Sequence, residues 1–255
     1  MCKRFWLTIL GVLCFCGWIV SHSWANTPVD LSSKPISEIA TWQRFLIDIQ
    51  TLIPDVDLDI RYYRDYNFVG RRIDGYQAPK CLLTPAATQA LAAVQADLAP
   101  QGYALKIYDC YRPQQAVDLF VLWAEDLDDR QMQQQFYPQV NKADLFQDGY
   151  IAAKSGHSRG STVDVTLVPL KSKTTPCTRS RPCQDNSLDM GTAFDYFDPL
   201  SHTLNFQISP EQQQNRLRLK TAMERQGFRN LPEEWWHYTL QNEPYPETYF
   251  NFPVQ

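Results

Sequence analysis

The stretch that most constrains the fold of this chain runs from Ser155 to Leu167 and reads S-G-H-S-R-G-S-T-V-D-V-T-L. Two glycines in its first half indicate a tight, irregular turn. In its second half, valines and a leucine alternate with polar residues, which is the period of a half-buried strand. The pattern places His157 in the turn and Asp164 on the polar face of the strand. Such an arrangement can hold two metal ligands on a rigid support.

The N-terminal residues have the form of an export signal. Lys3 and Arg4 precede an apolar run from Phe5 to Val20, and Ser23-Trp24-Ala25 fits a signal-peptidase site. We therefore predict that residues 1–25 are removed and that residues 26–255 form one domain. The apolar run is short for a bilayer span, which needs about 20 residues. We expect no stable membrane span after cleavage, with an uncleaved anchor as the alternative.

Removal of the signal takes away two of the 24 basic residues and none of the 28 acidic ones, so the mature net charge is −6. The sequence contains no block of lysine or arginine, which argues against nucleic-acid binding. The mature chain is long enough to bury a substantial core.

Four cysteines remain in the mature chain, and an even number in an exported protein predicts two disulfides. Three pairings are open. We favour Cys177–Cys183, across a short loop, and hence Cys81–Cys110. Four unpaired thiols are the alternative, and the lack of a C-x-x-C pair disfavours a structural zinc site.

Helix and strand patterns follow one another along the chain without a repeat or a second-domain linker. Thr84-Pro85 and the capping box at Ser209–Gln212 mark two helix starts. The predicted helices are Ile36–Leu52, Pro85 to Pro100, Pro113 to Trp123, and Pro210 to Gly227, and the further predicted strands are Val56–Ile60 and Tyr103–Asp109. The polar segment Lys171–Asn186 indicates a surface insertion with its own disulfide.

The mature chain has only three histidines, His157, His202 and His237. Two histidines and one carboxylate would leave one position of a tetrahedral zinc open, as catalysis requires. Bound water would then be acidified towards neutral pH and attack a carbonyl group. The HExxH signature is absent, and a lone histidine is more often an ordinary surface or core residue. Spacing alone leaves both interpretations open.

A hydrolase also needs a general base beside the attacking water. Glu233 and Glu234 both lie close to His237 in sequence. In a regular strand Glu233 would share the face of His237, so periodicity alone favours Glu233. Either residue is alternatively a solvated loop carboxylate.

Two further kinds of charged residue fit a site that binds a small peptide. Arg112, at a strand-to-helix junction, is suited to an oxyanion or a carboxylate, or alternatively to a surface ion pair with Asp109. Asp189 and Asp195 are suited to a substrate ammonium, or alternatively to forming a turn.

Five motifs in the same order resemble those of the D-alanyl-D-alanine dipeptidases. They are D-C-Y-R-P, S-G-H-S-R-G-S-T-V-D-V-T-L, M-G-T-A-F-D, E-W-W-H-Y and the tail E-P-Y-P-E-T-Y-F-N-F-P-V. The similarity runs from about Val56 to the C-terminus. It implies the fold shared with the hedgehog signalling domain: a single α+β domain with a small, mainly antiparallel sheet flanked by helices.

The resemblance also implies roles for particular residues. It assigns His157, Asp164 and His237 as ligands of one Zn²⁺ ion. It makes Glu234 the catalytic base in place of Glu233, and this implies a turn or a bulge between Glu234 and His237.

On the substrate side, the resemblance assigns Arg112 to the tetrahedral intermediate and Asp195 to the free ammonium of a dipeptide. Tyr62, with Tyr63 beside it as a looser alternative, and Ser155 are its remaining substrate-binding residues. The implied substrate is a small D,D-dipeptide.

The implied activity is hydrolysis of D-alanyl-D-alanine to two D-alanines. With the export signal, it predicts a periplasmic enzyme that processes dipeptide from cell-wall turnover or recycling. A D,D- or L,D-carboxypeptidase acting on peptidoglycan stem peptides, and a non-catalytic zinc-binding module, are the alternatives. The insertion at Lys171–Asn186 is long for this family and is expected to influence access to the site.

Overall fold

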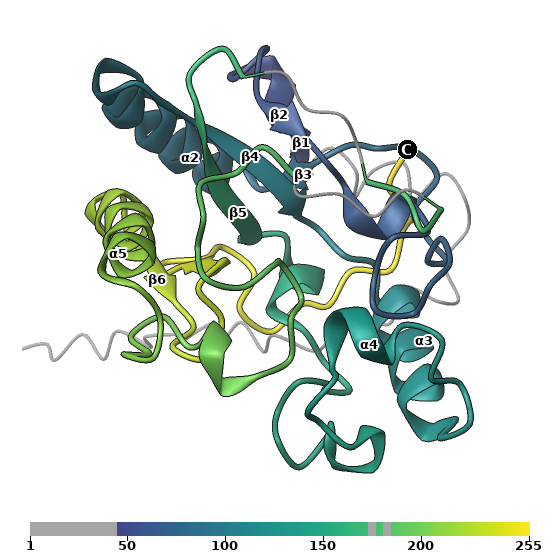
Figure 1. The fold of residues 1–255 in the computed structure, drawn as a ribbon. Helices are drawn as coiled ribbons and strands as arrows, with labels where there is room; N and C mark the ends of the chain where they lie inside the picture. The colour runs from purple at the N-terminus through teal and green to yellow at the C-terminus, as the bar shows by residue number, and fades with distance from the viewer. Residues whose placement is uncertain (1–44, 173–176, 181–184) are drawn as a thin grey trace, which may run out of the picture.

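The computed structural model describes residues 45–172, 177–180 and 185–255 (Figure 1). Its helices are α2 (Pro85–Leu98), α3 (Gln114–Glu125), α4 (Gln133–Phe136) and α5 (Pro210–Arg225). Its strands are β1 (Ile47–Asp48), β2 (Asp57–Leu58), β3 (Leu82–Leu83), β4 (Tyr103–Asp109), β5 (Thr162–Pro169), β6 (Phe228–Asn230) and β7 (His237–Leu240).

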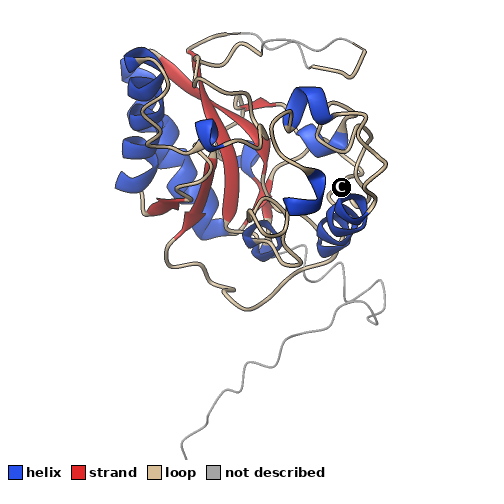
Figure 2. Ribbon diagram, turned by 60° about the horizontal axis from the view of Figure 1, so that its bottom comes forward, coloured by secondary structure: helices blue, strands red, loops and turns tan. Residues whose placement is uncertain are grey.

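Five strands form the central sheet in the order β2-β4-β5-β7-β6. Only the β2–β4 pair is parallel, and the other three pairs are antiparallel. Helices lie on both sides of the strands (Figure 2), and α2 packs against α5. The expected α+β domain with a mainly antiparallel sheet and flanking helices is confirmed.

The long helices begin where their capping signals predict. The Thr84 side chain accepts a hydrogen bond from the amide of Ala87 at the start of α2. Ser209 and Gln212 form the predicted capping box of α5. Both signals act within one turn of the chain, so they do not depend on tertiary contacts.

Residues 36–44 of the helix predicted at Ile36–Leu52 lie outside the described residues. In the described part, the prediction is wrong. Residues 47–48 form β1, which pairs with β3, and residues 49–51 form a 3₁₀ turn. The amide of Ile49 donates to the carbonyl of Cys81 at 3.0 Å. Tertiary pairing with the Cys81 segment therefore overrides a weak apolar stripe. The strand predicted at Val56–Ile60 is shortened to β2.

The predicted disulfide between Cys81 and Cys110 is confirmed. Cys177 is also disulfide-bonded, while its favoured partner Cys183 lies outside the described residues. The export signal likewise lies outside them. Within the described ranges, no helix is long and apolar enough to cross a membrane.

Candidate active site

Two of the predicted ligands face each other in the sheet. Asp164 of β5 is the register partner of His237, the first residue of β7. His157 lies in the 3₁₀ turn Gly156–Arg159 before β5, where the Ser155 hydroxyl accepts a hydrogen bond from the His157 amide. The turn ends at Gly160, which has a φ of +76°, and an added Cβ there would lie 2.5 Å from a Leu46 methyl carbon. Glycine is therefore required at this point.

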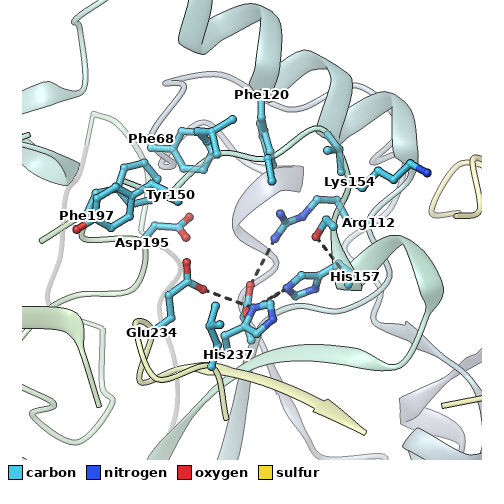
Figure 3. Close-up of a pocket in the computed structure, with 18 of the residues that line it drawn as sticks. Phe68, Arg112, Phe120, Tyr150, Lys154, His157, Asp195, Phe197, Glu234 and His237 are labelled. Atoms are coloured by element: carbon cyan, nitrogen blue, oxygen red, sulfur yellow. Dashed lines mark hydrogen bonds and ion pairs between the residues drawn. The ribbon is translucent and has the colours of Figure 1, made fainter. Parts of the chain in front are cut away.

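The three side chains converge on one point (Figure 3). Oδ1 of Asp164 lies 3.2 Å from Nε2 of His157 and 3.1 Å from Nδ1 of His237. The two histidine nitrogens are 3.2 Å apart. These are the three ligand atoms of a possible metal site.

The hydrogen bonds around this cluster fit a cation at its centre. Nδ1 of His157 is 2.7 Å from the Cys110 carbonyl oxygen, so Nδ1 carries the proton and Nε2 presents its lone pair. Oδ1 of Asp164 is buried, and no donor in the described part of the chain is aligned to hydrogen-bond to it. Lone pairs that converge without protons between them form a donor set for a metal.

The electrostatics of the cluster agree with this geometry. Burial lowers the pKa of His157, although the negative charge of Asp164 acts to raise it. The imidazole of His157 is therefore neutral. Burial alone would raise the pKa of Asp164, but His157 and His237 lower it below the usual range. Burial would also lower the pKa of His237, but the adjacent carboxylate of Asp164 raises it. Asp164 thus remains an anion that attracts positive charge.

Glu234, rather than Glu233, lies beside His237 in the site. The amide of His237 donates to the Glu234 carbonyl at 3.3 Å, so the chain turns between them. The preference for Glu233 from strand periodicity is wrong, because β7 begins only at His237. Glu233 is exposed, whereas Oε2 of Glu234 lies 3.5 Å from Nδ1 of His237. Burial raises the pKa of Glu234, although His237 opposes the shift.

Arg112 enters the same site from the segment after β4. Its Nε donates to Oδ2 of Asp109 at 2.9 Å, and one terminal nitrogen lies 3.5 Å from Oδ2 of Asp164. The guanidinium carbon is 4.9 Å from the Tyr62 ring centroid and 5.3 Å from that of Phe120. Arg112 thus forms the expected ion pair with Asp109. The pair is buried in the site rather than on the surface, because the Arg112 side chain is only 12% exposed.

Asp195 forms the opposite wall of the site, as Figure 3 shows. The Tyr62 hydroxyl donates to its Oδ2 at 2.9 Å, whereas Tyr63 does not line the cavity. Burial raises the pKa of Asp195 well above its usual range, and the nearby Asp164 raises it further. Asp195 has a φ of +60°, a strained backbone for a non-glycine residue. The other candidate, Asp189, is exposed and lies outside this cavity.

These side chains surround one cavity of about 200 Å³. All eight predicted site residues line it. The sequence patterns do not reveal its apolar wall, which comes from separate segments and comprises Phe68, Phe120, Tyr150 and Phe197. Asp109 was expected only as a surface partner of Arg112, whereas in the structure it orients Arg112 within the site. His202 lies away from the cavity.

Comparison with known proteins shows the family to which the chain belongs. The family model described as D-ala-D-ala dipeptidase matches residues 43–255. The chain is 38% identical over 206 residues to the D-alanyl-D-alanine dipeptidase of Enterococcus faecalis, covering 81% of this chain and 96% of that protein. The corresponding enzyme of Escherichia coli is 33% identical over 202 residues, covering 79% and 88%. The chain therefore belongs to the D-Ala-D-Ala dipeptidase family of metal-dependent peptidases.

Proposed function

We propose that this protein is a zinc-dependent dipeptidase that hydrolyses D-alanyl-D-alanine to two D-alanines. The observation that carries the proposal is the position of Asp195. Its buried carboxylate faces the same cavity as the His157–Asp164–His237 cluster. One cavity therefore contains a donor set for a metal and, in Asp195, a buried carboxyl group that a substrate ammonium would stabilise in its ionised form.

The donor set supports zinc as the metal. Two imidazoles and one carboxylate are ligands of catalytic zinc sites that keep a further position open. Nitrogen and oxygen ligands about 2.0–2.1 Å from a tetrahedral zinc lie about 3.4 Å from one another. The three separations of 3.1–3.2 Å in this protein are close to that value. When bound, zinc polarises the scissile carbonyl and acidifies a water molecule.

The chain supplies the groups that move the proton and stabilise charge. Glu234 takes a proton from the attacking water and passes it to the leaving amine as the peptide bond breaks. The raised pKa of Glu234 suits it to both steps, because a base works best near the operating pH. Arg112 donates hydrogen bonds to the oxyanion that forms on the carbonyl carbon. Asp109 holds the guanidinium in place for this contact.

The substrate is selected by charge and size. The carboxylate of Asp195 pairs with the free ammonium of the dipeptide, and Tyr62 orients that carboxylate. A blocked amine would leave a buried carboxylate unpaired, which is a strong basis for rejection. The cavity of about 200 Å³ is smaller than the roughly 300–1,000 Å³ of sites for drug-sized ligands.

The proposal extends to a periplasmic location and a role in cell-wall turnover. The N-terminal sequence, with two basic residues before an apolar run and a small-x-small site, supports export. The Cys81–Cys110 disulfide is compatible with an oxidising compartment. In that compartment, the enzyme would process dipeptide released from peptidoglycan.

A substrate panel on the zinc-loaded mature protein tests this function. We expect release of D-alanine from free D-Ala-D-Ala, and at least about 100-fold lower kcat/KM on the N-acetylated dipeptide and on muropeptides, because a missing polar partner is penalised strongly. Activity on muropeptides alone would favour a D,D- or L,D-carboxypeptidase. Zinc binding without hydrolysis of any D,D- or L,D-peptide would favour a non-catalytic module, although Glu234 and Arg112 in the cavity argue against one.

A further inference from the structure

We propose that the Cys81–Cys110 disulfide is a positioning element for the metal site, acting through the main-chain carbonyl of Cys110. This inference rests on the proposed zinc site and goes beyond it to how His157 is oriented. The carbonyl oxygen accepts the hydrogen bond from Nδ1 of His157 at 2.7 Å. The disulfide is attached to the same residue that carries this carbonyl.

The hydrogen bond determines which nitrogen of His157 faces the metal. A carbonyl can only accept, so Nδ1 must carry the proton and Nε2 keeps its lone pair. Nε2 is the atom that lies 3.2 Å from Oδ1 of Asp164. The His157 side chain is only 1% exposed, so water has little access to replace a displaced carbonyl.

Cys110 needs an additional restraint because it lies beyond the regular sheet. The β4–β5 register shifts between Ile107 and Asp109, and β4 ends at Asp109. Such an irregularity disrupts the ladder locally, and Cys110 comes after Asp109, the last residue of β4 that pairs with β5. The carbonyl of Cys110 is therefore not fixed by strand pairing.

Two main-chain hydrogen bonds and the disulfide provide that restraint. The amide of Tyr111 donates to Leu82 at 3.0 Å, and the amide of Arg112 donates to His157 at 3.3 Å. The disulfide joins Cys110 to Cys81, whose carbonyl accepts from Ile49. Both cysteines are buried. The disulfide is thus the covalent restraint on a segment that also carries Arg112.

Replacing both cysteines tests the proposal, because alanine retains the main-chain carbonyl while the covalent restraint on it is lost. For Cys81→Ala with Cys110→Ala we expect about 10-fold or more weaker zinc binding, since loss of such supporting contacts costs about 10–100-fold. Affinity is measured by competition with a chromophoric chelator. The matched control is Cys177→Ala with Cys183→Ala, which removes the other predicted disulfide and should leave zinc affinity unchanged.

Two further measurements separate positioning from general destabilisation. At saturating zinc, the kcat of the Cys81/Cys110 variant should return to within a few-fold of wild type, since Arg112 and Glu234 remain in place. In metal-free wild-type protein, ¹⁵N NMR should show the Nδ1–H tautomer of His157, and this measurement does not require the variant to fold.

Three results bear on the inference differently. Equal zinc affinity in the folded variant and in wild type would overturn it, as would an Nε2–H tautomer in metal-free wild type. Wild type that binds no zinc would instead refute the proposed function, and the tautomer would still decide whether the Cys110 carbonyl orients His157.

Discussion

Asp164 and His237 are cross-strand partners in the antiparallel β5–β7 pair, and Oδ1 of the first lies 3.1 Å from Nδ1 of the second. Register alone brings these two side chains together, because directly opposed residues have neighbouring Cβ atoms. His157 reaches the same point from a turn instead. The site therefore combines two ligands fixed by the sheet with one that depends on loop contacts.

His157→Ala should lose stoichiometric metal, because two remaining ligands cannot complete the site. Metal content after dialysis, measured by mass spectrometry, provides the check. His202→Ala is the matched control, since His202 lies outside the cavity, and it should retain one metal per chain. A full metal content in His157→Ala would contradict the assignment of His157 as a ligand.

Glu234→Gln should keep the metal and lose at least about 100-fold in kcat, the lower range for loss of a general base. The amide has nearly the same shape but cannot accept the proton. Glu233→Gln is the control: its side chain is exposed, so kcat should stay within about two-fold of wild type. The comparison uses steady-state kinetics with metal content measured on the same samples. Equal losses in both variants would refute Glu234 as the base.

Asp195→Asn should lower kcat/KM for D-Ala-D-Ala by about 100-fold without changing metal content, because a charge-assisted hydrogen bond to the ammonium is lost. Tyr62→Phe removes the donor to Asp195 and should cost about 10-fold. Asp189→Asn, an exposed carboxylate outside the cavity, should have no effect. If Asp195→Asn hydrolysed the free dipeptide as well as wild type does, Asp195 would not bind the ammonium.

Asp185 should make the stability of the fold depend on pH in acid. It accepts a 2.8 Å hydrogen bond from Arg61, and Lys106 lies 3.8 Å away. Burial alone would raise the pKa of Asp185, but Arg61 and Lys106 lower it below the ordinary value of 3.8. The folded state then favours the charged form. This stabilisation is present above the unfolded pKa and disappears as pH falls through the folded pKa.

Asp185→Asn should therefore reduce the free energy of unfolding at neutral pH by about 2 kcal/mol, since it removes a hydrogen bond between charged groups. Asp59 remains as the other carboxylate paired with Arg61. The difference from wild type should shrink below about pH 4, where the wild-type carboxylate takes up its proton. Urea unfolding between pH 3 and pH 7 measures this difference in the free energy of unfolding. Asp74→Asn, which breaks an exposed pair with Arg71, should change stability little at any pH. A constant difference for Asp185→Asn would contradict the pKa shift.

The sequence predicted the elements whose signals are local. The capping residues of α2 and α5 and the alternation in β5 act between near neighbours in the chain, so they were readable without the fold. The family motifs named the three ligands that the structure brings together, Asp164 and His237 on paired strands and His157 in a turn. The Ile36–Leu52 helix was wrong where described, because its hydrogen bonds go to the Cys81 segment.

The sequence by itself determined the class of chemistry: the identities of the candidate ligands, the base and the charged substrate contacts. Only the tertiary structure decided which segments form the wall of the cavity, that Asp189 lies outside it, and that a Cys110 carbonyl orients His157. The physical reason is the separation along the chain of the residues that interact. Periodicity and capping depend on neighbours a few residues apart, whereas turns, cavity walls and main-chain acceptors are set by packing between segments distant in sequence.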